Sequence, residues 1–305
     1  MCRVHHADSE PITIDDALLR GRPLPPFSPD ANKDGRGSVL VIGGTRETPG
    51  GVLLAGRASL RAGAGRLCLA TVESMSRGLA IEVPEARVVS LGEDDHGSID
   101  RNATDVLLAL SAEYDAVLLG PGIVDPEPIT GLVRALLRAA TSSTTVVLDA
   151  AALGIASSEP DEIASSHATV ILIPNTKEMG TLLGCDETMV RDEPVSSLLD
   201  AVTTFRTSVA LRGADTWVTA PDEALYLERD GTIALATAGS GDVFAGALAG
   251  FVARGASPLL ALLWAVHVHA RTGSALAQEL GIGVLASDLL DALPLTLTAL
   301  DAASQ

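Results

Sequence analysis

The sequence has little positive charge and no cluster of it. Lys33 and Lys177 are its only lysines, and 21 Lys and Arg stand against 39 Asp and Glu, which gives a formal net charge of −18. Nucleic-acid and anionic-membrane binding both depend on clustered Lys and Arg. We therefore expect neither a nucleic acid nor a membrane as a partner of this protein.

Cysteine is also scarce. Cys2, Cys68 and Cys185 lie far apart and form no Cys-x-x-Cys pair, so we expect neither a disulfide framework nor a thiolate zinc site. The polar, acidic N-terminus lacks the apolar core of a signal peptide. The longest apolar stretch, between Arg254 and Arg271, is shorter than the roughly 20 residues of a membrane-spanning helix. A reducing cytoplasm is the simplest location.

Hydrophobic residues are plentiful, at 47% of 305 residues, enough for a full-sized core. From Ser38 onward, short runs rich in Val, Ile and Leu without alternation are typical of strands buried on both faces. These runs are 38–44, 66–71, 115–120, 144–150 and 168–174. The stretches between them have helical periodicity, at 51–63, 74–82, 126–140 and 175–184. Such alternation predicts a mostly parallel sheet with helices on both faces.

The pattern changes after residue 207. Short, closely spaced runs predict antiparallel strands at one sheet edge, within 208–213, 216–221, 223–228 and 232–237. They are followed by apolar helical patterns at about 241–254, 257–280 and 286–293. Residues 1–37 are rich in proline, which disfavours a regular helix, so we expect an irregular lead-in there. We expect residues 38–305 to form a single α/β domain.

The segment AGSGDVFAGALAG (238–250) has the strongest chemical signal. Gly239, Ser240 and Gly241 open a helix, where the tight glycine backbone and the positive end of the helix dipole suit a phosphate. Asp242 lies in the first turn and can accept a proton from a substrate hydroxyl. The alternative is a plain helix cap, which this motif alone does not exclude.

Two other strand ends carry polar residues. Arg212 precedes Gly213 in VALRGADTWV (209–218) and can bind a phosphate in bidentate fashion, although this motif taken alone favours an exposed Arg before a turn. Asn175 and Glu178 lie three residues apart in PNTKE. This spacing forms a capping box, and it also suits Asn175 at a substrate and Glu178 near a magnesium–water shell. The two interpretations are compatible.

Further turns follow neighbouring strands. LLGPGI (118–123) contains Gly-Pro-Gly, and VVLDAAAL (146–153) places Asp149 at a strand end; ligands bind at this edge of open α/β sheets. The glycines of VIGGT lack the G-x-G-x-x-G spacing of a dinucleotide fingerprint, so we do not expect a Rossmann-type dinucleotide site there.

His267 and His269 lie two residues apart on one helix and face different sides, so we expect structural roles and no metal pair. His5 and His6 are interpreted as incidental.

Taken in order, these motifs resemble the ribokinase-like superfamily. Within it, the chain is most similar to the stand-alone ADP-dependent NAD(P)H-hydrate dehydratases, the family of the YjeF C-terminal domain. The resemblance runs from about Asn32 to Pro294 and rests on NKDGRGSVLVIGGT, PGGVLLAGRASLRAGAG, LLGPGI, VVLDAAAL, PNTKE, LRGADTWV, ATAGSGDVFAGALAGFVARG and ASDLLDALP. It implies a three-layer αβα fold with a mostly parallel central sheet and antiparallel edge strands. The separate YjeF-type epimerase domain has no counterpart among these motifs.

The resemblance also implies an activity: repair of hydrated NADH or NADPH by phosphoryl transfer from ADP to the ring hydroxyl, followed by elimination. A magnesium requirement and a homo-oligomer, such as a tetramer, are implied with it. Asp242 matches the family's acid/base. The residues implied for the adenine nucleotide are Arg212, Gly213, Ala214, Asp215, Thr216, Gly239, Ser240 and Gly241. Those implied for the substrate are Gly51, Gly122, Asp149 and Asn175, with Glu178 holding the metal through water.

Three positions depart from the family pattern. Asn175 stands where the family usually has His, Ala151 where it has the second Asp of Asp-Ala-Asp, and Arg212 where it has Lys. Two other hypotheses follow from these differences. Asn-x-x-Glu in PNTKE is typical of an ATP-dependent kinase for a small hydroxylated metabolite, a sugar or vitamin precursor. The changes on the substrate side also fit a diverged nucleotide-binding sensor without turnover.

Overall fold

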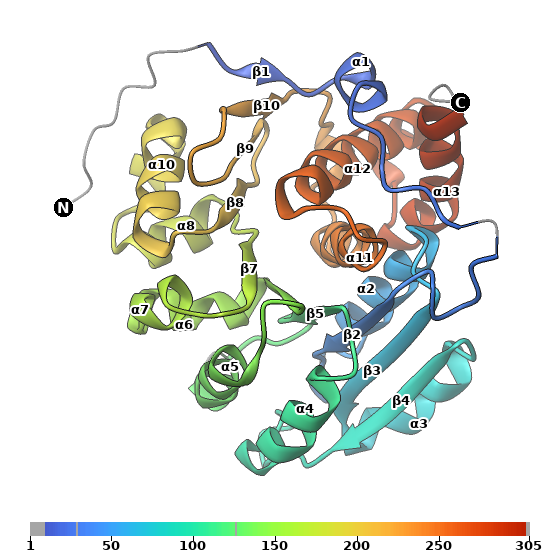
Figure 1. Cartoon of the computed structure of the whole chain (residues 1–305), viewed down its shortest axis with the longest axis vertical. Helices are drawn as coiled ribbons and strands as arrows, with labels where there is room; N and C mark the ends of the chain where they lie inside the picture. Colours follow the sequence, from blue (N-terminus) through green and yellow to red (C-terminus); the bar gives the residue numbers. More distant parts are fainter. Residues whose placement is uncertain (1–9, 29, 126, 303–305) are drawn as a thin grey trace.

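The computed structural model describes residues 10–28, 30–125 and 127–302; Cys2, His5 and His6 lie outside these ranges. Within them, ten strands form one sheet in the order β1-β10-β9-β8-β7-β6-β5-β2-β3-β4 (Figure 1). The strands are β1 (Ile12–Thr13), β2 (Ser38–Ile42), β3 (Arg66–Val72), β4 (Ala86–Leu91), β5 (Ala116–Leu119), β6 (Thr145–Leu148), β7 (Thr169–Leu172), β8 (Ser208–Leu211), β9 (Thr216–Thr219) and β10 (Tyr226–Glu228). The run from β8 to β4 is parallel throughout, whereas β9 is antiparallel to both neighbours.

Helices cover both faces of the sheet. One layer contains α2 (Gly50–Arg61), α3 (Glu73–Glu82), α11 (Ser240–Ala253), α12 (Pro258–Leu280) and α13 (Ala286–Ala302). The other contains α4 (Thr104–Ser111), α5 (Glu127–Ala139), α6 (Gly154–Ser158), α7 (Pro160–Ala164), α8 (Thr176–Leu183), α9 (Glu187–Asp192) and α10 (Pro194–Phe205). The three-layer, mostly parallel fold expected from the sequence is thus confirmed.

The apolar strands supply both cores because successive side chains of a strand point to opposite faces. In β2, Val39 and Val41 belong to the core under α2 and α11, whereas Leu40 and Ile42 belong to the core on the other face. All five residues of β2 are buried. This two-sided burial explains why the strand sequences show continuous apolar runs.

Helix α11 packs very closely on α2. A Cβ atom at Gly246 would lie 2.0 Å from the carbonyl oxygen of Ala55, and one at Gly250 would lie 2.6 Å from that of Ser59. Neither distance leaves room for a side chain, so the glycines set the separation of the two helices. This close packing fixes the position of the α11 N-terminus above the sheet.

Of the irregular lead-in predicted over residues 1–37, the structure describes residues 10–28 and 30–37, and there the prediction is wrong in part. β1 pairs in parallel with β10, and α1 (Asp16–Arg20) follows it, with Asp15 capping its N-terminus. The buried side chains of Ile14 and Leu19 join the core beneath. The prolines from residue 23 onward do exclude a helix there among the described residues, but they come after this small structured unit.

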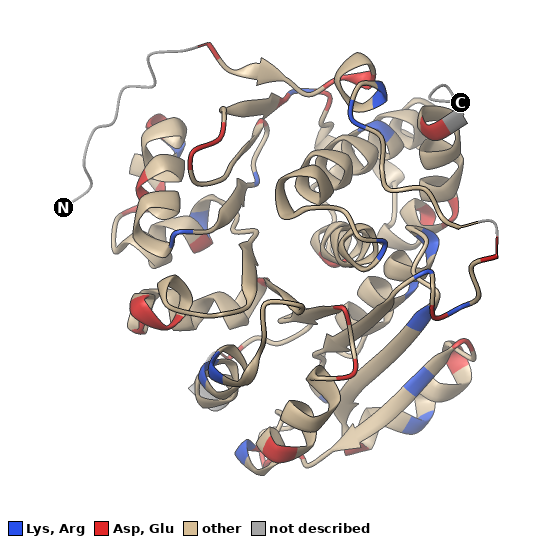
Figure 2. Ribbon diagram, in the orientation of Figure 1, with Lys and Arg blue, Asp and Glu red and all other residues tan. Residues whose placement is uncertain are grey.

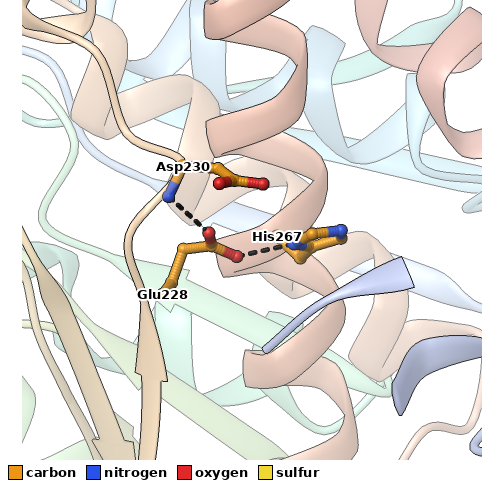
Figure 3. Close-up of side chains that lie close together, drawn as sticks. All are labelled: Glu228, Asp230 and His267. Carbon is orange, nitrogen blue, oxygen red and sulfur yellow. Dashed lines mark hydrogen bonds and ion pairs between the residues drawn. The ribbon is translucent and has the colours of Figure 1, made fainter. Parts of the chain in front are cut away.

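A buried histidine attaches the α1 segment to the sheet. His267 of α12 is 1% exposed; its Nδ1 lies 2.6 Å from Glu228 Oε2, and its Nε2 lies 2.9 Å from Asp16 Oδ1. Figure 3 shows the contact with Glu228, whose other oxygen accepts the backbone N–H of Asp230. Burial lowers the pKa of His267, whereas the hydrogen bonds and charges of Glu228 and Asp16 raise it. Their combined effect exceeds that of burial, so the pKa lies above its usual value. The expected structural role of His267 agrees with these contacts.

Other differences from the sequence predictions concern short elements. The strand expected over 232–237 is instead a single 3₁₀ turn, η3 (Ile233–Leu235), capped by Thr232. The last helix extends to Ala302 and contains Pro294, rather than ending near residue 293. Strand β4 and helices α4, α6, α7, α9 and α10 were not predicted. β4 lies at the sheet edge and is only partly buried, so its sequence lacks the continuous apolar run of the central strands.

The charged residues do not gather along one element. Figure 2 shows Lys and Arg dispersed among many helices and strands, with Asp and Glu between them. Among the described residues, no helix combines the length and apolar character needed to cross a membrane. Neither Cys68 nor Cys185 forms a disulfide within the described part of the chain.

The α11–α2 contact predicts the effect of two matched glycine substitutions. Gly246→Ala must push its Cβ against the Ala55 carbonyl, so we expect it to lower the free energy of unfolding by about 1–3 kcal/mol. Gly131 on α5 is exposed, and a Cβ added there would have no described atom within 4 Å; Gly131→Ala should be neutral or stabilising by up to about 1 kcal/mol. Urea denaturation of both variants measures this, and equal stabilities would contradict the packing account.

Candidate functional site

The carboxyl ends of the parallel strands bring the predicted polar residues to one edge of the sheet. Strands β2, β5, β6, β7 and β8 are consecutive neighbours in that sheet. The segments that follow them contain Gly43 and Gly44, Gly120 and Gly122, Asp149, Asn175, and Arg212 respectively. The α11 N-terminus lies at the same edge, because a Cβ at Gly241 would meet Arg212 Nη1 at 2.6 Å. This edge is the candidate site.

A pocket of about 630 Å³ opens at this edge, within the size range of small-ligand sites. Six of the eight residues expected to bind a nucleotide line it: Arg212, Gly213, Ala214, Thr216, Ser240 and Gly241. Asn175 lines it as well. Asp215, by contrast, faces Arg229 at 3.6 Å and is half-exposed, so its predicted nucleotide contact is not supported by this arrangement.

The start of α11 suits an anion. Gly239 has a φ of 88°, a left-handed conformation that favours glycine, and no described side chain caps the helix. A Cβ at Gly239 would also lie 2.5 Å from Leu54 Cδ1. The first amide groups of a helix lack partners within it and carry the positive end of the dipole. The α11 N-terminus can therefore bind a phosphate beside the pocket.

Arg212 holds a fixed positive charge in this site. Its Nε–H donates to the Ile173 carbonyl at 2.8 Å, and its Nη2 donates to Asp149 Oδ1 at 2.8 Å. Glu178 Oε2 lies 3.6 Å from the same Nη2. The guanidinium carbon also lies 5.6 Å from the centre of the Phe244 ring. These contacts orient the guanidinium before any ligand arrives.

The carboxylate of Asp149 is almost completely buried, at 3% exposure. Burial raises its pKa to about 7, although the charge of Arg212 opposes the rise and the charges of Glu178 and Asp242 add to it. Its carboxylate accepts a hydrogen bond from Arg212. The structure thus gives Asp149 a role in orienting Arg212, and its contact with substrate stays a prediction.

Asp242 lies in the first turn of α11 and is not among the residues that line the pocket. Its carboxylate accepts the backbone N–H of Gly122, and its pKa is raised by burial, with Arg212 and this hydrogen bond opposing the rise. Gly122 in turn lies against Gly51, where a Cβ would be 2.4 Å from the Gly122 nitrogen. Asp242, Gly51 and Gly122 thus form one group, as expected from the sequence, next to the phosphate site.

Asn175 and Glu178 form the predicted capping box of α8. The Glu178 N–H donates to Asn175 Oδ1 at 2.9 Å, and the Asn175 N–H donates to Glu178 Oε2 at 2.8 Å. Helix stability therefore accounts for both residues. Glu178 is still 25% exposed and lies beside Arg212. A carboxylate next to a phosphate site fits the oxygen-rich, water-retaining coordination of Mg²⁺.

Several residues that line the pocket were not predicted from the sequence. His269 and Phe244 form part of the pocket wall, with Thr176, Glu228, Gly231, Thr232, Ile233, Leu235, Ala236, Val266 and Ala270. Most are small or apolar and carry no motif. His269 was visible in the sequence, but was interpreted as structural because of its apolar helix. Its contact with the motif residue Ser240 depends on the packing of α12 beside α11.

One further cluster has the composition of a metal site. In the part of the chain that the structure describes, Glu228, Asp230 and His267 are the group whose potential ligand atoms lie within 4.8 Å of one another. Both imidazole nitrogens of His267 are already hydrogen-bonded to carboxylates. We therefore interpret the cluster in Figure 3 as a hydrogen-bond network.

The fold and the position of the site define a class of protein, the ribokinase-like α/β proteins. A ribokinase-like superfamily protein from Enterococcus faecalis has the same fold, with a TM-score of 0.82 over 97% of this chain and 99% of that chain at 21% identity. A pyridoxal kinase from Staphylococcus aureus is more distant, with a TM-score of 0.54 over 78% of this chain and 88% of that chain at 16% identity.

The sequence comparisons define the family within this class. A sequence model described as NAD(P)H-hydrate dehydratase matches residues 39–295, and the chain belongs to the NAD(P)H-hydrate dehydratase family. An ADP-dependent (S)-NAD(P)H-hydrate dehydratase from Xanthomonas campestris pv. campestris is 41% identical over 92% of this chain and 94% of that protein. The ADP/ATP-dependent NAD(P)H-hydrate dehydratase structure from Bacillus subtilis has a TM-score of 0.80 at 25% identity, covering 96% of this chain and 100% of that one.

Longer relatives also match. A bifunctional NAD(P)H-hydrate repair enzyme from Moorella thermoacetica is 32% identical over 91% of this chain. The chain spans 52% of that protein, so only one part of the bifunctional enzyme corresponds to it.

Proposed function

We propose that this protein is a lyase that dehydrates hydrated NADH and NADPH with ADP as co-substrate. The observation that carries the proposal is the placement of Asp242 between the Gly122 turn and the α11 N-terminus. A group able to accept a proton thus lies beside a site able to bind phosphate. The Xanthomonas relative, similar over nearly its whole length, has a name that states this activity.

In the proposed reaction, Asp242 accepts the proton of the ring hydroxyl while that oxygen attacks the terminal phosphorus of ADP. The P–O bond to AMP breaks, and phosphate then leaves the ring carbon with its C–O electron pair as the ring loses a proton. The products are NADH or NADPH, AMP and inorganic phosphate. The amides of Gly239 and Gly241, together with Arg212, would stabilise the phosphoryl charge, which is the main task of a protein in phosphoryl transfer. The Ser240 N–H, expected to act with them, donates instead to the Thr237 carbonyl at 3.2 Å.

Magnesium is part of this proposal. When bound, Mg²⁺ would neutralise phosphate charge. Glu178 would hold it through a water molecule, since its carboxylate is partly exposed beside the pocket. The Bacillus subtilis structure was co-crystallised with ATP and Mg²⁺, which supports nucleotide use within the family.

The two other functions receive less support from the site. The Asn-x-x-Glu pattern behind the kinase hypothesis is a complete capping box, so helix stability alone accounts for it. The sensor hypothesis gives no role to a half-buried carboxylate beside the phosphate site. Activity with ATP on a panel of sugars and vitamin precursors, without activity on hydrated NADH, would favour the kinase.

Three broader expectations remain proposals. We propose that residues 38–305 act as a single domain, which is supported by the one sheet that joins the described strands. A homo-oligomer is supported by exposed apolar side chains such as Ile282 and Leu285. A cytoplasmic location stays a prediction from the sequence.

Replacing Asp242 tests the proposed catalytic base. Asp242→Asn keeps the size and polarity of the side chain but cannot accept the proton, so we expect turnover of hydrated NADH to fall by at least ~10²-fold with nearly unchanged ADP affinity. Asp105→Asn, at an exposed position of α4, is the matched control and should leave turnover unchanged. Undiminished turnover of Asp242→Asn would remove Asp242 from the mechanism.

The pH dependence of the reaction tests the charge of Arg212. Asp242 must be ionised to act as a base, and burial raises its pKa whereas Arg212 lowers it. Removing that charge in Arg212→Gln should move the acid limb of kcat/KM to higher pH. Arg212→Lys keeps the charge and should leave the limb near its wild-type position, although both variants lose the paired contacts of the guanidinium. Identical acid limbs in the two variants would contradict the electrostatic account.

A further inference from the structure

His269 contacts the first residue of the phosphate-binding helix. Its Nε2 lies 3.0 Å from the Ser240 hydroxyl oxygen and 3.1 Å from the Ser240 carbonyl oxygen. His269 comes from α12 and Ser240 begins α11, so this contact joins two helices that both line the pocket. Among the described residues, no side chain caps the start of α11. The contact from His269 therefore ties this helix start to α12.

The carbonyl partner determines where the imidazole hydrogen lies. A carbonyl oxygen can only accept, so Nε2 must carry the hydrogen, which it shares between the Ser240 carbonyl and hydroxyl oxygens. The hydroxyl oxygen then receives a hydrogen bond from His269. Its own hydrogen is consequently not used in this contact and can point to an acceptor in the pocket.

The surroundings of His269 keep this arrangement fixed. The imidazole packs edge-on against Phe244, with ring centres 5.7 Å apart and planes at 69°. The same phenyl ring lies under the Arg212 guanidinium. Burial and the charge of Arg212 lower the pKa of His269 to about 4. The ring is therefore neutral near pH 7, with its one N–H on Nε2.

We propose that His269 is a positioning residue for the nucleotide phosphates: its Nε2–H orients Ser240 so that the Ser240 hydroxyl donates a hydrogen bond to a phosphate oxygen. This inference rests on the proposed function for the identity of the ligand. An acceptor at Nε2 would instead take the Ser240 hydrogen and leave an oxygen lone pair facing the phosphate. The tautomer of His269 thus decides whether Ser240 attracts or repels the anion.

Two polar substitutions separate this role from simple packing. The amide N–H of Gln reaches close to the position of Nε2, whereas that of Asn reaches only to the position of Nδ1. We therefore compare His269→Gln with His269→Asn, each with and without Ser240→Ala. Titration calorimetry with ADP and separate KM values for ADP and hydrated NADH are the measurements. His96→Asn, at an exposed surface position, is the control.

We expect His269→Asn to weaken ADP binding by about 10-fold, the scale of one hydrogen bond to a charged group. His269→Gln should stay within about 3-fold of the wild type on the same scale. The loss in His269→Asn should appear in the KM for ADP and not in the KM for hydrated NADH. In the Ser240→Ala background, Asn and Gln at position 269 should bind ADP equally, because the hydroxyl that His269 orients is gone.

Other outcomes would overturn the inference. Equal ADP affinities of the Gln and Asn variants, or the same difference with and without Ser240, would show that His269 does not act through that hydroxyl. These outcomes leave the proposed function intact, since wild-type turnover is measured separately. A wild-type protein that binds ADP but does not dehydrate hydrated NADH would contradict the proposed function alone.

Discussion

Helix α11 reaches the sheet edge because two of its glycines let its backbone touch that of α2. A Cβ at Gly246 would lie 2.0 Å from a carbonyl oxygen of α2, so any larger residue would move the helix outward. The helix start carries the two features on which the proposed chemistry depends, a row of amides and the carboxylate of Asp242. Displacement of about 1 Å at such a site is enough to lower rates substantially.

Charge balance is the second constraint on the site. Arg212 is surrounded by Asp149, Glu178 and Asp242, and it opposes the rise in pKa that burial causes in Asp149 and Asp242. Its guanidinium is held by a carbonyl and a carboxylate at once, which the single ammonium of Lys could not reproduce. The site therefore combines one fixed cation with several carboxylates. The cation would attract a bound phosphate, and the carboxylates would attract its metal ion.

The sequence predicted the parts of this protein that have strong local signals. The continuous apolar strands, α2, α11 and α12 and the edge where the site lies all followed from periodicity and motifs. β1 and α1 were missed because their stability comes from distant partners, Tyr226 and His267, rather than from local pattern. The same holds for the site: Gly241 and Asp242 belong to a motif, whereas His269 gains its role only through packing against Ser240.

The most direct test of the account measures two products of one reaction. Purified protein is mixed with ADP, Mg²⁺ and hydrated NADH, and inorganic phosphate is followed together with the absorbance of reduced nicotinamide. The account predicts that both rise together in equal amounts and that neither rises without ADP. Phosphate release without recovery of NADH, or no reaction from protein that binds ADP, would contradict it.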